Sequence, residues 1–142
     1  MKAYSFLDTL LLINGFPISG FGDDDTTIEV KRLADSASHK MGTDGEMTLS
    51  LSANLSGEII FRLMQTSTDN GLLSTLISNQ ESGTFVPIFA EFKDVRGGDL
   101  GSGTLGYIPR PADLGRGETA KSQEWRVVVE RLDLLHLGVE SF

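Results

Sequence analysis

Hydrophobic and polar residues alternate along much of this chain, with the two-residue period typical of β-strands. The clearest run covers residues 47–53, where Met47, Leu49 and Leu51 alternate with small hydroxyl residues. This alternation predicts a strand with one buried face. A second apolar run, at residues 57–66, follows a short Asn-Leu-Ser-Gly segment, so the spacing predicts that the two strands form a hairpin.

The remaining elements follow from shorter patterns. Residues 69–79 carry apolar pairs at helical spacing, and Asp69 is the predicted N-cap of that helix. Residues 33–46 are polar and aperiodic, which predicts a long loop. Further strands are predicted at residues 4–13, 28–31, 85–93, 104–108 and 124–137.

Length and composition limit the classes of protein. The chain has 142 residues, of which 39% are hydrophobic and 23% charged, so we expect a single globular domain over residues 1–142. It has no cysteine, which excludes disulfides, thiolate nucleophiles and cysteine zinc sites. The net charge of -8 disfavours a surface that grips nucleic-acid phosphates. We expect a soluble chain without a membrane span or secretion signal, because its apolar N-terminal patch is short.

Residues 101–106 match the letters of the dinucleotide-binding fingerprint G-x-G-x-x-G. That motif binds pyrophosphate only where it opens a helix. Pro109 and Pro111 follow almost at once and forbid such a helix. We therefore expect no dinucleotide cofactor here and interpret the glycines as part of a flexible loop.

Other residues with metal-binding or catalytic chemistry are few. The acidic triplet at residues 23–25 lacks the spacing of a calcium loop and is interpreted as a solvated loop. His39 and His136 have no neighbours that complete a metal site or a catalytic triad, so we expect exposed histidines. Trp125 is expected to anchor the core or an interface. The sequence thus predicts no catalytic residue, no metal site and no cofactor.

Both faces of the predicted strand at residues 85–93 carry apolar side chains, including Phe85, Phe89 and Phe92. A strand at a subunit contact has this pattern, and so does a strand buried at the centre of a sheet.

The order of strand, turn, strand and short helix in the middle of the chain resembles the tail-tube proteins of contractile-tailed bacteriophages. The opening MKAYSFLD is also similar to the start of these subunits. Further similar stretches are MGTDGE at residues 41–46, NLSGEI at 54–59, LMQTS at 63–67, EW at 124–125 and LDL at 132–134.

The resemblance implies a mainly β fold, a β-sandwich or small barrel with one short flanking helix. It implies six copies per ring, rings stacked into a hollow tube, and a contractile sheath outside. Such a subunit belongs to the virion and is assembled in the cytoplasm of the bacterial host. Its partners would be other copies, the sheath, the baseplate and the tail terminator, while the tape-measure protein and DNA pass through the lumen without specific binding. Members of this kind have no catalytic residues.

The resemblance also suggests which residues line the lumen and which contact other subunits. Residues 33–46 would reach the adjacent ring, and small hydroxyls would suit the lumen wall. The candidate lumen residues are Thr48, Ser50 and Ser52, and the candidate subunit-contact residues are Phe85, Phe89, Phe92, His39 and Met41.

Two alternatives remain open. The same fold serves the tube proteins of type VI secretion systems and contractile bacteriocins, so fold alone does not separate these from a phage. A monomeric β-sandwich that binds a carbohydrate or a protein is a different class, and would stay monomeric at high concentration.

Overall fold

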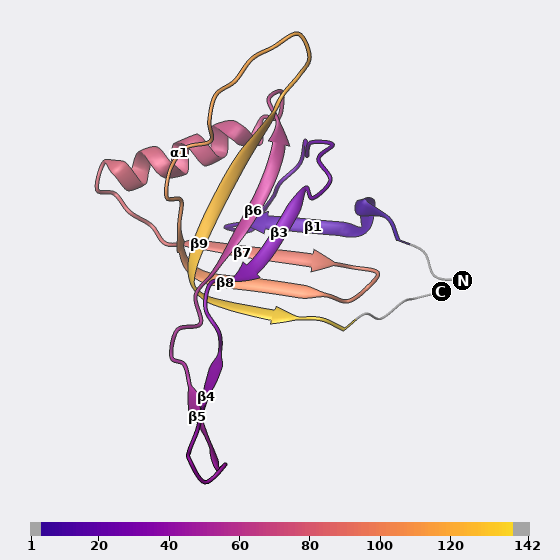
Figure 1. Ribbon diagram of the computed structural model, residues 1–142. Helices are drawn as coiled ribbons and strands as arrows, with labels where there is room; N and C mark the ends of the chain where they lie inside the picture. The colour runs from indigo at the N-terminus through magenta and orange to yellow at the C-terminus, as the bar shows by residue number, and fades with distance from the viewer. Residues whose placement is uncertain (1–3, 138–142) are drawn as a thin grey trace.

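The computed structural model describes residues 4–137 and consists mainly of one antiparallel sheet with a helix beside it (Figure 1). The strand order in this seven-stranded sheet is β2-β1-β7-β8-β9-β6-β3, and β4 and β5 form a separate two-stranded sheet. The elements are η1 (Phe6–Asp8), β1 (Thr9–Ile13), β2 (Phe16–Pro17), β3 (Ile28–Arg32), β4 (Ala37–Met41), β5 (Met47–Leu51), β6 (Gly57–Met64), α1 (Asp69–Glu81), β7 (Ile88–Asp94), β8 (Leu100–Tyr107) and β9 (Ser122–Leu135).

Strand β9 joins the two halves of the sheet. Its first part pairs with β6 and its second part with β8. Figure 1 shows β3, β6 and the start of β9 running steeply across β1, β7 and β8. The inner faces of both halves share one apolar core, but the pairing does not close into a barrel, since β2 and β3 remain edges in the described residues. The predicted mainly β fold with one flanking helix is confirmed.

The glycines at residues 101–106 lie in strand β8, so their interpretation as a flexible loop was wrong. Gly101, Gly103 and Gly106 are all buried on the inner face. A Cβ on Gly103 would lie only 2.7 Å from the Cγ1 of Val129, and one on Gly101 would lie 3.1 Å from the Cγ1 of Val30. Because these residues have no side chains, Val129 of β9 and Val30 of β3 pack directly onto the backbone of β8.

Helix α1 covers one end of the core. The predicted apolar stripe is confirmed, since Leu73 and Ile77 are buried in the core cluster. The N-cap is Thr68 rather than Asp69. The Asp69 carboxylate instead accepts hydrogen bonds from the backbone N–H and the hydroxyl of Ser19, at 2.7 and 3.2 Å. Trp125 is a core residue, only 3% exposed.

The predicted hairpin between residues 47–53 and 57–66 was wrong, and so was the predicted loop at residues 33–46. Strand β5 pairs with β4, in the register Met41↔Met47 to Ala37↔Leu51. Strand β6 pairs with β3 and β9 instead. The turn that sets the β4–β5 register is the Gly-Thr-Asp-Gly sequence, where Gly45 has a φ of 86° and the Asp44 carboxylate accepts from the N–H of Glu46 at 3.0 Å.

The other predicted strands are confirmed with shifted bounds. Strand β1 occupies only the end of residues 4–13, because η1 precedes it. Strand β7 begins at Ile88, after Pro87, and β8 is longer than predicted. Strand β9 agrees closely with the prediction.

The close packing on β8 gives a stability prediction. We expect Gly103→Ala to lower the free energy of unfolding by about 1–3 kcal/mol, because the new methyl group overlaps the branched side chain of Val129. Gly71→Ala, in α1 with nothing within 4 Å of its Cβ position, should raise it by about 0.5–1 kcal/mol. Urea unfolding of the two variants measures both effects, and equal stabilities would contradict this account of β8.

Candidate assembly surfaces

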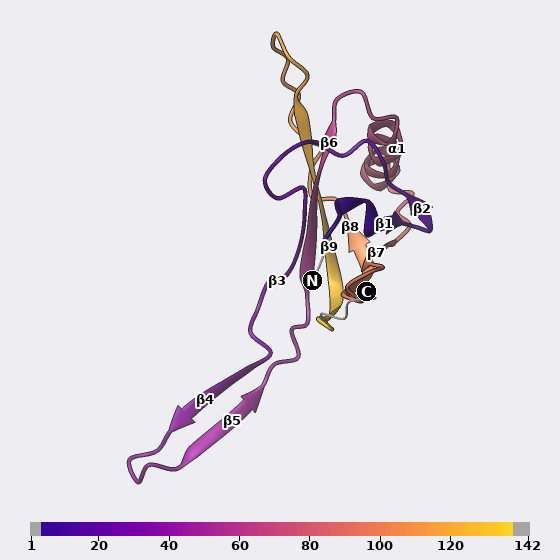
Figure 2. The ribbon, with the colours of Figure 1, turned by 90° about the vertical axis from the view of Figure 1, so that its right-hand side faces the viewer.

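The β4–β5 hairpin projects away from the rest of the molecule as an arm (Figure 2). All ten residues of its two strands are exposed. Cross-strand pairs in an antiparallel hairpin share a face, so the register defines two faces. The apolar face consists of Ala37, His39, Met41, Met47, Leu49 and Leu51, and the polar face consists of Ser38, Lys40, Thr48 and Ser50.

The predicted buried face of residues 47–53 was therefore wrong. Leu49 is 59% exposed and Leu51 is 81% exposed, because no second layer among residues 4–137 covers the arm. The period of the sequence gave the correct alternation but could not show whether anything packs against it. An exposed apolar face of this kind is typical of a surface that binds another chain.

Several predicted site residues come together on the arm. Thr48 and Ser50, predicted for the lumen, lie side by side on the polar face, while Ser52 lies just beyond the strand and its backbone N–H donates to Ser36. His39 and Met41, predicted for subunit contacts, lie on the apolar face. His136, like His39, is exposed.

The three candidate phenylalanines do not form one cluster. Phe89 is 40% exposed on β7, whereas Phe92, on the opposite face of that strand, packs against the core. Phe85 precedes the strand and is 49% exposed. Sequence reasoning missed Leu105 and Tyr107, which are also exposed, on β8. Alternation with Gly106 identifies Tyr107, but simple alternation from Gly103 would place Leu105 on the buried face, and its positive φ of 54° turns it outward, which the sequence does not show.

Charged residues occupy the outer face of β3, β6 and β9. Glu58 is at the centre, only 5% exposed, and its two carboxylate oxygens contact Lys31 Nζ at 3.2 Å and Arg126 Nε at 3.3 Å. On the same face, Arg62 pairs with Glu124 at 2.9 Å. These ion pairs join three neighbouring strands and hold their side chains in defined positions.

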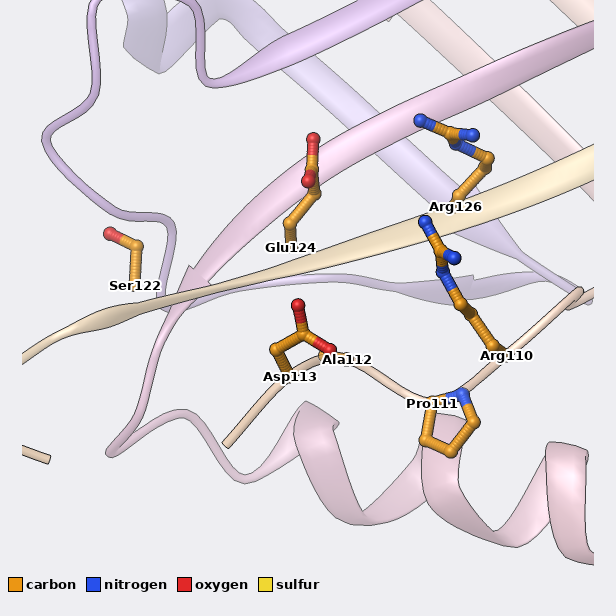
Figure 3. A pocket seen from close by; sticks show the side chains of 7 residues that line it. All are labelled: Arg110, Pro111, Ala112, Asp113, Ser122, Glu124 and Arg126. Carbon is orange, nitrogen blue, oxygen red and sulfur yellow. The ribbon is translucent and has the colours of Figure 1, made fainter. Parts of the chain in front are cut away.

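A cleft of about 260 Å³ lies between β9 and the segment that follows β8 (Figure 3). In Figure 3 the guanidinium group of Arg110 extends toward β9 on the side of Arg126, and Asp113 extends toward Glu124. Arg126 and Glu124 have ion-pair partners on the sheet, whereas Arg110 and Asp113 have none among residues 4–137. The cleft is lined by Arg110, Pro111, Ala112, Asp113, Ser122, Glu124 and Arg126.

Within the described part of the chain, no group of three or more histidine and carboxylate side chains gathers where it could hold a metal ion. None of the helices described there has the length and apolar character needed to cross a membrane. The surfaces that stand out are thus the arm, the charged outer face and the cleft.

Comparisons with known proteins identify a family and a similar fold. The family model described as the bacteriophage PhiTE tail tube protein matches residues 1–135. The fold is similar to that of a chain from the sheath/tube terminator of PVC, an extracellular contractile injection system in its extended state. The TM-score is 0.66 at 8% identity, covering 95% of this chain and 98% of that chain. An identity this low shows a shared fold only. No curated protein matches the chain.

The ion pairs of Glu58 give a second prediction. We expect Glu58→Ala to lower the free energy of unfolding by about 1–2 kcal/mol, because Lys31 and Arg126 lose their shared partner. The loss should be below the ~3–5 kcal/mol typical of fully buried pairs, because water reaches both cations. Asp133→Ala breaks an exposed pair with Arg131 and should change stability by less than about 0.5 kcal/mol. Chemical unfolding measures both variants. If Glu58→Ala and Asp133→Ala lower the free energy of unfolding equally, the ion pairs of Glu58 stabilise the sheet no more than an exposed pair does.

Proposed function

Because the chain belongs to the bacteriophage PhiTE tail tube protein family, we propose that six copies form a ring and that rings stack into the hollow tube of a contractile tail. The structural tail-tube role rests on the family match, which extends over nearly the whole chain. The mainly β fold and its likeness to a chain of a contractile injection system agree with that role.

The arm supports assembly from copies of this chain. A two-stranded hairpin is only marginally stable in water unless a third strand or another layer joins it. Within the described part of the chain the apolar face of the arm has no such cover, with Met41 and Met47 more than half exposed. A neighbouring copy provides the cover, and the arm takes over the ring-to-ring role that the sequence suggested for residues 33–46.

The finer parts of the proposal concern partners and location. The sheath surrounds the tube, the baseplate and the tail terminator close its ends, and the tape-measure protein and DNA pass through the lumen without specific binding. Thr48, Ser50 and Ser52 line that lumen, and Phe85, Phe89, Phe92, His39 and Met41 contribute to subunit contacts. The protein works as a single domain with no enzymatic activity, in virions assembled in the bacterial cytoplasm.

A tube protein of a contractile secretion or bacteriocin particle is the second candidate. It is favoured by the similar fold of a chain from an extracellular contractile injection system. The family match favours a phage tail over a secretion or bacteriocin particle. Electron microscopy of the purified protein tests both against a monomeric binding module, because rings or hollow tubes are expected only from a tube subunit.

Assembly should depend on the apolar face of the arm. We expect Leu49→Ser to leave the subunit folded, because Leu49 is already 59% exposed. The variant should require at least about tenfold more protein to form tubes, since a buried leucine contact is worth roughly 1.5–3 kcal/mol. Ser38→Ala, on the polar face, is the matched control and should assemble normally. Light scattering and negative-stain microscopy measure assembly, and normal tubes from Leu49→Ser would exclude this face as a contact.

Passage through the tube should depend on lumen charge. We expect Ser50→Lys to place a ring of positive charges along the channel, which would attract DNA phosphates and slow ejection. The slowing should be greatest at low ionic strength, since the Debye length is about 10 Å at 0.1 M salt and about 30 Å at 0.01 M. Ejection rates from variant particles at both salt concentrations measure the effect. An ejection rate that is unchanged at low salt would contradict the placement of Ser50 in the lumen.

A further inference from the structure

The two edges of the seven-stranded sheet, β2 and β3, differ in whether they can accept a further strand. Strand β2 has only two residues. The N–H of Ile18 donates to the carbonyl oxygen of Leu11 at 2.9 Å, so the nitrogen of Pro17 lies on the side of β2 away from β1. Because proline has no N–H, this edge offers no donor there. Strand β3 has five residues with neither a proline nor a bulge, so its edge is open.

The free backbone groups of β3 can be identified from the alternation of its hydrogen bonds. The N–H of Arg62 donates to the carbonyl oxygen of Thr27 at 3.0 Å, so the odd-numbered residues bond to β6. The backbone groups of Ile28, Val30 and Arg32 point the other way. Among residues 4–137, no hydrogen bond reaches these groups from another segment. We call these three residues the β3 edge, and its first two side chains pack against the core.

Strand β5 of the arm combines free backbone groups with apolar side chains in the same way. The N–H of Gly42 donates to the carbonyl oxygen of Glu46 at 2.8 Å, so the even-numbered residues of the arm bond within it. The backbone groups of Met47, Leu49 and Leu51 therefore point to the side of β5 away from β4. These three residues are also the part of the apolar face that β5 contributes.

We propose that β5 of one copy adds, antiparallel, to the β3 edge of a second copy. This contact rests on the proposed function, because it joins tube subunits. Both strands are five residues long, and full overlap pairs Leu51 with Ile28 and Leu49 with Val30. Backbone hydrogen bonds would supply affinity, as in other cases where a strand is added to a sheet edge, and the apolar side chains would add to it.

The side chains select the antiparallel direction. In an antiparallel ladder, residues that bond to each other lie directly opposite, with their side chains on the same face. The apolar face of the arm then continues the core side of the β3 edge. In a parallel ladder each bonded residue lies opposite a residue of the other face, so Thr48 and Ser50 would lie beside Ile28 and Val30. Hydroxyl groups on the core side would replace most of the apolar contact.

The orientation of the copies gives the same direction. Strand β3 runs toward the arm, β4 runs out to the tip of the arm, and β5 runs back toward the body (Figures 1 and 2). In copies that point their arms the same way, β5 of one copy therefore runs antiparallel to β3 of the next, whereas β4 runs parallel to it. Direction and face thus both identify β5, rather than β4, as the added strand.

The surroundings of the β3 edge suit this strand. A cavity of about 200 Å³ opens at the start of β3, and its lining includes Phe6 and Phe92. Leu51, which is 81% exposed, would lie beside this cavity and gain cover there. On the other side of the ladder, Thr48 and Ser50 would join the charged outer face of the sheet. The proposed lumen residues and that face would then form one surface.

A pair of introduced cysteines tests the contact directly, because the chain has none of its own. Glu29 and Ser50 would be a pair without mutual hydrogen bonds, with Cα atoms about 4.5 Å apart, which a disulfide can span. We expect oxidised tubes of Glu29→Cys/Ser50→Cys to give covalent multimers on a non-reducing gel. The matched control is Glu29→Cys/Lys40→Cys, because Lys40 shares the polar face of the arm but lies on β4. The control should stay monomeric on the gel.

Proline at position 30 gives an independent readout. Val30→Pro removes the donor at the centre of the β3 edge and leaves the bonds to β6 in place. Val30→Ala is the matched control, since it also loses the valine side chain but keeps the N–H. We expect the protein concentration needed for tubes to be at least about tenfold higher for the proline variant than for the alanine variant. Light scattering measures this concentration.

The outcomes separate the contact from the proposed function. If wild-type tubes form but Glu29→Cys/Ser50→Cys gives no multimers, or the Lys40 control is linked instead, the contact is wrong while the proposed function stands. The same holds if Val30→Pro assembles as readily as Val30→Ala. If Val30→Pro does not fold, the cysteine pair decides. If the wild-type chain forms no tubes at any concentration, the proposed function itself is wrong.

Discussion

The structure depends on the close approach of the two halves of its sheet. A sheet that crosses over itself needs space where its inner faces meet, and β8 provides this space by presenting glycines at three inner positions. Gly57 plays the same part on β6, where a Cβ would lie 2.4 Å from Leu132. Because these backbones approach so closely, β9 can serve both halves, and Trp125 and the helix close the end of a continuous core.

Much of the fold could be predicted from local patterns, because an element that is buried on one side has apolar residues at regular intervals in its sequence. Strands β3 and β9 and the stripe of α1 were found in this way. Pairing was harder, since alternation in residues 47–51 is the same whichever strand lies beside it. The glycines at 101–106 were misread because glycine favours loops unless a neighbouring segment packs on it, and only the three-dimensional structure shows that Val129 does.

The candidate site was predicted only in part, for a related reason. The sequence identified the chemistry of Thr48, Ser50, His39 and Met41, but their exposure depends on surfaces that another chain must cover. The cleft was not foreseen. Its sequence signal is the pair Pro109 and Pro111, which follows the last pair of β8 with β9, Tyr107↔Val128, but only the three-dimensional structure shows that this segment lies across the cleft from β9. The ion pairs of Glu58 likewise join residues far apart in sequence.

The arm projects from one end of the subunit and the segment after β8 extends from the other, and this makes any stack of copies directional. One end of a tube would present arms that contact no further copy, and the other end would present the surfaces that arms contact elsewhere in the tube. The two ends therefore differ chemically although every subunit is identical. In such a stack, a subunit that joins one end would bind by its arm and a subunit that joins the other end would bind by the surface that receives an arm, so proteins that cap the two ends would have to recognise different surfaces.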